Sequence, residues 1–378
     1  MSLNQNRNKI SESLTFSIRL LLFLLISIYS IGLSAQQKVK KEIKIEKADL
    51  LLHDQSVISD VDRLVGNVKI SHRNIVLFCD SAWSYQSSNS VDAFGNVHVI
   101  TKDTIHLYAT IIHYKGDIAM AEARGHVVLK DPKLTLTTDS LDFDTKNQVG
   151  YYNTGGKIVD STNTLTSIIG RYYSQSNELF FKDSVRLVNK DYIMKSDTMK
   201  YNTKTEIVYI VGPTHIVGDS STLYSESGWF DTQKKRTELN KKSTIRKGDT
   251  QLQGDYIFYN DSNGEGYARG NVIINDFKNS IIVAGNKATY NDFSKNAFIT
   301  DSALFIQYQK NDSLFLHADT LYTKPDTSAI NQKMVITHDN VRFFKKDMQG
   351  ACDSMVYFTK DSIIQLYTDP ILISLIRS

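Results

Sequence analysis

Histidine is the residue type in this chain best suited to acid–base or metal chemistry. None of the nine histidines stands with a carboxylate at the spacing that places metal ligands on one face of a helix. The chain also contains no nucleophile elbow, phosphate-binding loop or dinucleotide fingerprint. We interpret the histidines as ordinary strand residues, and we predict no enzyme activity, no catalytic residue and no cofactor. The histidines are His53, His72, His98, His106, His113, His126, His215, His317 and His338.

Aspartate followed by serine or threonine is the next candidate, because repeated carboxylates could bind calcium. Examples are Asp80, Asp139 and Asp197. Calcium-binding β-rolls need glycine-dense nonapeptides, which this chain lacks. Such aspartates more often form hydrogen bonds between side chain and backbone in turns. We therefore favour the turn interpretation and predict no metal site.

The remaining reactive groups are few. Cys79 and Cys352 lie too far apart for a short-spaced disulfide framework, so we expect two buried free thiols. The basic segments Lys234–Arg236 and Lys241–Lys242 could contact lipid phosphates or could keep strand edges soluble, and we favour the second interpretation. Nothing resembles a nucleic-acid-binding module. The net charge of +3 is likewise no polyanion-binding profile.

The N-terminus reads as an export signal. Arg7, Lys9 and Arg19 precede the uncharged run 20–35, which ends in Ser34 and Ala35. This layout predicts a Sec-type signal peptide over residues 1–35, cleaved near Ala35. We expect a lead-in segment over 36–48, a repeat domain over 49–370 and an apolar tail over 371–378. Division of the domain into two consecutive sub-arrays, and truncation of the chain at the tail, are left open.

An internal repeat of about thirty residues is the strongest pattern in the sequence. One segment type, Asp-x-apolar-x-aromatic, is clearest at Asp139–Phe143, Asp197–Tyr201 and Asp255–Tyr259. Successive copies are 27 to 34 residues apart, so chance is a poor explanation. Their first residues are at positions 80, 110, 139, 170, 197, 226, 255, 286, 319 and 353.

A second segment type alternates with the first. It reads Gly-[Asn/His]-Val and is seen at Gly66, Gly95, Gly125 and Gly270. Both types have apolar residues at every second position, which places those residues on one face of a strand. Polar clusters such as Gln86–Asn89 separate the segments as turns. We predict an all-β, elongated repeat array of about ten two-stranded units, with no helix in the repeats.

The alternating Gly-Asn-Val-x-Ile and Asp-x-apolar-x-Tyr strands, together with the export signal, resemble the OstA-like/LptA family of periplasmic lipopolysaccharide-transport proteins. The resemblance covers about residues 45–370 and is closest to the OstA-like proteins of Bacteroidetes. It implies a V-shaped β-jellyroll, or β-taco. It also implies a periplasmic location, with association to the outer membrane left open. Implied partners are lipopolysaccharide or lipid A and other Lpt-type β-jellyroll proteins, joined end to end by strand addition, with self-association also open.

The resemblance implies that the chain shields lipid A acyl chains in an apolar groove during transfer to the outer membrane. Burial of one methylene contributes about 0.8 kcal/mol, so a row of apolar residues could hold several chains. The candidate groove residues are Val68, Ile70, Val97, Val99, Val127, Leu129, Leu141, Phe143, Met199, Tyr201, Ile257, Tyr259, Val272 and Ile274.

Two other functions remain open. A structural or adhesive β-repeat protein would fill its interior with these same side chains and bind no ligand. A polysaccharide-processing β-helix enzyme would need a cluster of acidic residues, and no such cluster stands out in the sequence.

Overall fold

The structure, a computed structural model, describes residues 43–53, 60–101, 104–308, 312–325 and 333–374. The predicted signal peptide and most of the predicted lead-in segment lie outside these ranges. The strands are β1 Lys44–Lys47, β2 Leu50–His53, β3 Val61–His72, β4 Ile75–Tyr85, β5 Ser90–Thr101, β6 Ile105–Lys115, β7 Met120–Lys130, β8 Thr135–Asp144, β9 Val149–Tyr152, β10 Gly156–Val159, β11 Asn163–Ser167, β12 Ile169–Tyr173, β13 Glu178–Asn189, β14 Tyr192–Asn202, β15 Ile207–Ile210, β16 Thr214–Gly218, β17 Ser221–Ser225, β18 Ser227–Asp231, β19 Arg236–Lys247, β20 Thr250–Asn260, β21 Glu265–Asp276, β22 Ile281–Asn291, β23 Asn296–Gln307, β24 Leu314–Pro325, β25 Lys333–Lys345, β26 Met348–Phe358, β27 Ile363–Tyr367 and β28 Ile371–Ser374.

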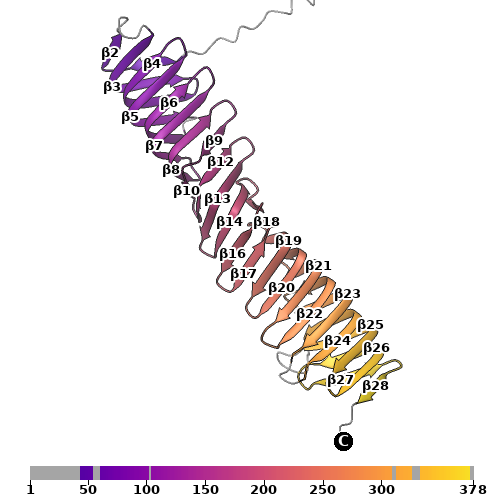
Figure 1. Cartoon of the computed structure of the whole chain (residues 1–378). Coiled ribbons are helices and arrows are strands. Elements are labelled where there is room, and N and C mark those ends of the chain that lie inside the picture. The colour runs from indigo at the N-terminus through magenta and orange to yellow at the C-terminus, as the bar shows by residue number, and fades with distance from the viewer. Residues whose placement is uncertain (1–42, 54–59, 102–103, 309–311, 326–332, 375–378) are drawn as a thin grey trace, which may run out of the picture. The chain divides into compact units, whose positions relative to one another are not determined.

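All strand pairs are antiparallel, and consecutive long strands are neighbours in one sheet. Figure 1 shows the strands following one another in chain order from β2 to β28. Several long strands are replaced by two short ones, for example β9 with β10 and β15 with β16. No helix forms in the described residues, and accordingly none there could span a membrane. The prediction of an all-β repeat array is confirmed.

Each long strand bends at its centre, where a bulge interrupts the pairing. In β3 the register jumps between Val65 and Val68, so Gly66 and Asn67 both oppose one residue of β4. These two residues have φ angles of 78° and 44°. Glycine and asparagine tolerate this left-handed region best, which explains the repeated Gly-Asn pair. A bulge of this kind bends a strand.

The bend divides the sheet into two arms. We call the side that contains Val68–His72 and Ile75–Cys79 arm 1, and the side that contains Val61–Val65 and Ser81–Tyr85 arm 2. Every second side chain of each arm points to the inner face, where the arms meet. The result is a β-jellyroll-like array whose core lies between the two arms.

The aspartates of the first segment type lie at these bends. Asp80 is exposed at the centre of β4 and accepts a hydrogen bond from Asn96 Nδ2 of β5 at 2.8 Å. The same bond joins Asn271 to Asp255. The turn interpretation was therefore wrong for Asp80, because this aspartate lies inside β4 and holds the bulge of the next strand instead of closing a turn. Both segment types of the repeat meet at this corner.

The turns lie at the ends of the arms, where the polar clusters predicted them. Residues 86–89 connect β4 to β5 and residues 261–264 connect β20 to β21. Part of the expected lead-in forms β1, which pairs with β3. Part of the expected apolar tail forms β28, which pairs with β26.

Candidate functional site

The inner faces of the two arms hold all fourteen candidate groove residues, in two sets. The deep set lies beside the bend and is at most 3% exposed. The mouth set lies farther from the bend and is partly exposed, because the facing arm does not cover it fully. Ile70 has a mouth position but is buried. The deep residues are Val68, Val97, Val127, Leu141, Met199, Ile257 and Val272, and the mouth residues are Val99, Leu129, Phe143, Tyr201, Tyr259 and Ile274.

The deep set forms the hydrophobic core. Val127 of arm 1 and Leu141 of arm 2 belong to the same cluster of buried side chains, as do Met199 and Val208. These side chains contact one another, which leaves no space for a ligand at their depth. The mouth residues Val99, Leu129 and Tyr201 pack against this core from outside.

A gap remains between the arms from β7 to β13. A cavity of about 30 Å³ lies there, with Leu129 and Leu134 on arm 1 and Phe143 on arm 2. Gly150 of β9 and Gly170 of β12 also line it. A Cβ added to Gly150 would meet Phe143 at an ordinary contact distance of 3.4 Å. The absence of a side chain at position 150 therefore creates part of this space.

Contacts between the arms close the mouth on both sides of the gap. Towards β3, His72 Nδ1 lies 2.7 Å from the hydroxyl of Tyr114, and both side chains are buried. Towards β18, the rings of Tyr192 and Phe230 meet edge to face with centroids 6.3 Å apart. An acyl chain longer than the gap would have to displace one of these contacts.

Further contacts join the arms in the second half of the sheet. Lys247 at the end of arm 1 forms an ion pair with Asp292 at the end of arm 2, at 3.2 Å. The Tyr357 hydroxyl of arm 2 donates to Gln307 Oε1 of arm 1. This half is therefore bridged along its length.

Burial shifts the pKa values of the tyrosines near the mouth upward. It raises the pKa of Tyr201 and of Tyr259 to about 12, and the Asp292 carboxylate contributes to the shift of Tyr259. Burial also raises the pKa of the Cys79 thiol to about 11. Cys79 and Cys352 are both buried and free, as expected.

A column of small residues was not recognised in the sequence. The residue before each corner aspartate faces the inside of the bend, where little space is left between the arms. A Cβ at Gly285, for example, would lie 2.5 Å from Ile299 Cγ2. The signal was available, because a small side chain precedes nearly every copy of the Asp segment. The column includes Cys79, Ala109, Thr138, Ser196, Ser225, Gly254, Gly285, Ala318 and Cys352.

In the middle of the chain this column is polar. Ser196 donates to the Thr198 carbonyl and lies 2.7 Å from the Thr214 hydroxyl. Ser225 similarly donates to the Ser227 carbonyl and lies 3.1 Å from Ser243 Oγ. Hydrogen bonds satisfy these buried hydroxyl groups, so they cost little stability.

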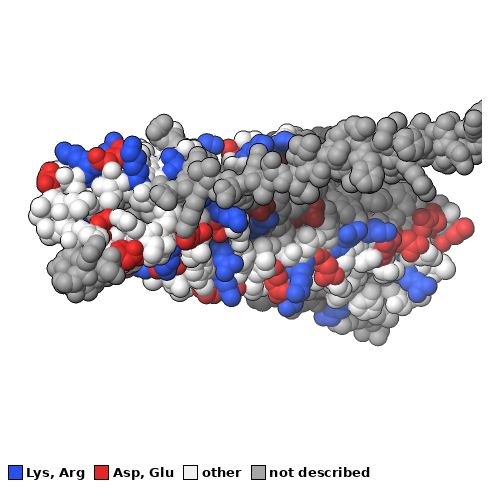
Figure 2. All heavy atoms as spheres, turned by 90° about the horizontal axis from the view of Figure 1, so that it is seen from above, with Lys and Arg blue, Asp and Glu red and all other residues white. Residues whose placement is uncertain are grey.

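The other chemical candidates have structural partners. His98 Nε2 lies 3.0 Å from His106 Nδ1 on the outer face. Within the described ranges no three His, Cys, Asp or Glu residues are placed to hold a metal ion. Lys241 and Lys242 form the bulge of β19 and pair with Glu226, at 3.4 and 3.1 Å. Figure 2 shows lysine and arginine interspersed with aspartate and glutamate over the visible face.

One known family matches part of this chain. Residues 40–197 match the family described as OstA-like protein. Among solved structures the chain is similar to LptH, the LptA-homologous periplasmic component of the lipopolysaccharide transport device of Pseudomonas aeruginosa. That similarity has 17% identity and a TM-score of 0.29, and it covers 34% of this chain and 95% of LptH. A comparison with curated proteins finds no match.

Proposed function

We propose, from the match of residues 40–197 to the OstA-like protein family, that the chain is a periplasmic component of lipopolysaccharide transport. It binds lipopolysaccharide and shields the lipid A acyl chains between its arms during transfer to the outer membrane. The role requires no catalytic step and no cofactor. A signal peptide cleaved near Ala35 delivers the chain to the periplasm.

The observation that carries this proposal is the row of partly exposed apolar side chains along the mouth of the groove. Leu129 and Phe143 line the same cavity from opposite arms. Since each methylene removed from water contributes about 0.8 kcal/mol, a few acyl segments between the arms would bind well. The cavity is small, so binding requires the arms to separate around the ligand while the deep core stays intact.

The free edges of the sheet support association with similar proteins. Among the described residues β2 pairs only with β3, and β28 pairs only with β26. The side chains on these strands are about half exposed, including Leu51 at 52% and Leu372 at 55%. Unpaired edges of this kind accept a further strand. We propose that another Lpt-type β-jellyroll protein, or a second copy, adds to one of these edges.

Native mass spectrometry with lipid extraction tests the ligand. The chain without residues 1–35 would be purified from a Gram-negative periplasm. Bound lipid A or lipopolysaccharide is expected. A mass that stays free of ligand after lipopolysaccharide is added would contradict the proposal.

A ligand-free structural or adhesive repeat protein is the second candidate. The observation in its favour is the tight packing of the deep set, in which Val127 and Met199 are each 1% exposed. The same mass spectra decide between the two functions. If the chain binds no ligand, the spectra would show no lipid. Gly150→Leu would then fill the cavity and stabilise the fold, with no loss of function.

A further inference from the structure

The outer face of arm 1 exposes large apolar side chains from β24 to β28. Two rows of cross-strand neighbours lie there, on the face opposite the core residues Phe305 and Leu316. Phe344 and Ile373 are 52% and 50% exposed. Exposed apolar patches of this kind mark binding surfaces. The first row is Leu304, His317, Arg342, Ala351 and Ile371, and the second is Ile306, Phe315, Phe344, Gln349 and Ile373.

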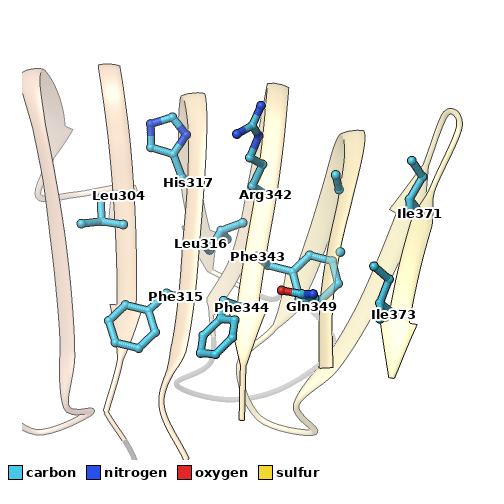
Figure 3. Close-up of a pocket in the computed structure, with 12 residues that line it drawn as sticks. Leu304, Phe315, Leu316, His317, Arg342, Phe343, Phe344, Gln349, Ile371 and Ile373 are labelled. Atoms are coloured by element: carbon cyan, nitrogen blue, oxygen red, sulfur yellow. The ribbon is translucent and has the colours of Figure 1, made fainter. Parts of the chain in front are cut away.

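A pocket of about 420 Å³ lies between these rows (Figure 3). Phe315 and Phe344 form one wall, with ring centroids 6.5 Å apart, and Ile371 and Ile373 form the other. Between the walls, β26 contributes only Gly350 and Ala351 to the lining besides Gln349. Ala351 lies between Arg342 and Ile371 on this face, and its small side chain leaves the space open. Its volume falls in the range of small-molecule sites.

Arg342 is the one formally charged side chain among the described residues that line the pocket, and His317 lies next to it. Arg342 and His317 are exposed cross-strand neighbours, and Figure 3 shows both at the end away from the phenylalanine rings. Neither side chain forms an ion pair or a hydrogen bond with the described part of the chain. The lining contains no carboxylate. An unpaired guanidinium beside apolar walls suits a ligand with an apolar tail and an anionic head.

We propose that this pocket binds an acyl or alkyl chain that carries a phosphate or carboxylate head. Arg342 donates two hydrogen bonds to the head and His317 supplies another donor. The phenylalanine and isoleucine walls cover the chain, and each methylene they bury tightens binding about fourfold. The site lies on the face opposite the groove, so it exists whether or not the groove binds lipopolysaccharide.

Photolabelling tests this site. The probes are dodecyl phosphate, laurate and dodecanol, each with a diazirine at the end of the chain and each used below its micelle concentration. The two anions should label β24, β25 or β28, and dodecanol should label them at least tenfold less. Arg342→Gln should abolish the difference between dodecyl phosphate and dodecanol. Ala351→Trp, which fills the pocket, should abolish the label there.

Arg186→Gln is the matched control, because Arg186 is an exposed arginine on the outer face of the same arm in β13. It should leave the label unchanged. Equal labelling by dodecanol, or a dodecyl phosphate label that persists in both pocket variants, would overturn the proposal. A label confined to the groove would also overturn it. If no label forms and Ala351→Trp changes the oligomeric state in solution, the patch is an interface between copies instead.

Discussion

Gly95 and Asn96 show how two adjacent residues bend a strand. Both have positive φ angles, and Asn96 holds the bend by its hydrogen bond to Asp80. A Cβ on Gly95 would lie 2.5 Å from Asp80 Oδ2. The glycine is thus required both for its backbone conformation and for the close approach of the carboxylate.

Gly95→Val should therefore destabilise the strands around it. The left-handed backbone alone should cost about 1–2 kcal/mol, and displacement of Asp80 should add to this. Urea unfolding measures the change in the free energy of unfolding, and hydrogen exchange of β4–β6 shows where the structure is destabilised. Gly155→Val is the control, since Gly155 has φ +86° but no atom within 4 Å of an added Cβ. Equal losses in the two variants would contradict the role of the close contact.

Lys241 occupies a corner position that glycine holds in other strands. Its φ is 66°, so Lys241→Gly should raise the free energy of unfolding by up to about 1 kcal/mol. The lost ion pair with Glu226 is exposed and worth less than that, and Lys242 still pairs with Glu226. Lys182→Gly, a strand position without positive φ, should instead lower stability. A loss of stability in both variants would argue against strain at Lys241.

The corner residues also show what a sequence can reveal. The Gly-Asn and Asp segments alternate regularly along the sequence, and this alternation was recognised. A bulge at Gly95 was predictable from the repeated glycine. The partner of each aspartate was not, because an Asp-Ser pair has the same local chemistry in a turn and at a bulge. The bulge at Lys241 and Lys242 could not be predicted either, since no local preference places lysine in the left-handed region.

The two arms are held together at the mouth by a few polar and aromatic contacts. One of them depends on pH. Hydrogen bonds from Lys295 and then Lys247 lower the pKa of Asp292 below its ordinary value of 3.8. A lowered pKa adds stability above pH 3.8, and this is lost as the pH falls through the folded-state value.

Asp292→Asn should accordingly reduce the free energy of unfolding by about 1 kcal/mol at pH 7. The difference from the unmodified chain should shrink below about pH 4 and vanish as Asp292 becomes protonated. Denaturant titrations at several pH values measure it. Lys247→Ala, which removes only the contact between the arms, should cause part of the same loss. A difference that stays constant down to pH 2 would rule out the ionised carboxylate as its source.

Leu129 and Val127 lie two residues apart on β7 but at different depths. Leu129→Asp should weaken lipopolysaccharide binding at least tenfold and keep the strand content, because its side chain lies at the mouth. Val127→Asp should instead unfold the surrounding strands, since it buries a carboxylate without a partner. Binding assays combined with circular dichroism separate these effects. Unchanged binding by folded Leu129→Asp protein would remove Leu129 from the site.

The molecule as a whole has two buried clusters instead of one. The first includes Leu141 and ends at Val208, and the second begins at Ile210 and includes Leu321. The polar part of the corner column, with Ser196 and Ser225, lies where they meet. In a repeat array each unit contacts only its neighbours, so the two halves can lose structure separately.

Leu141→Ala and Leu321→Ala should each lower the free energy of unfolding by about 2–5 kcal/mol. The loss should fall in the first half of the sheet for Leu141→Ala and in the second half for Leu321→Ala. Hydrogen exchange followed by mass spectrometry should show faster exchange before residue 208 in the first variant and after residue 210 in the second. Faster exchange over the whole chain in either variant would mean that the two clusters unfold as one.

The fold of the whole molecule was predictable from the sequence, because the same strand pattern recurs in every repeat. The alternation of apolar residues predicted that the fourteen candidates share one face, and the structure has them on the inner faces of the arms. It could not separate Val127, which is packed in the core, from Leu129 at the mouth. That difference depends on the distance between the arms and on residues of the opposite arm such as Gly150, where the lack of a side chain leaves space. The pocket beside Arg342 could not be predicted either, since its lining comes from five strands.

The most direct test of the central claim compares two adjacent residues of β7. Leu129 faces the groove and Val128 faces outward, and both are partly exposed. A photoreactive benzoylphenylalanine would be placed at each position in turn, in the chain exported to a Gram-negative periplasm. Lipopolysaccharide should crosslink to position 129 and not to position 128. Crosslinks from position 128 alone, or from neither position in folded protein, would contradict lipid binding between the arms.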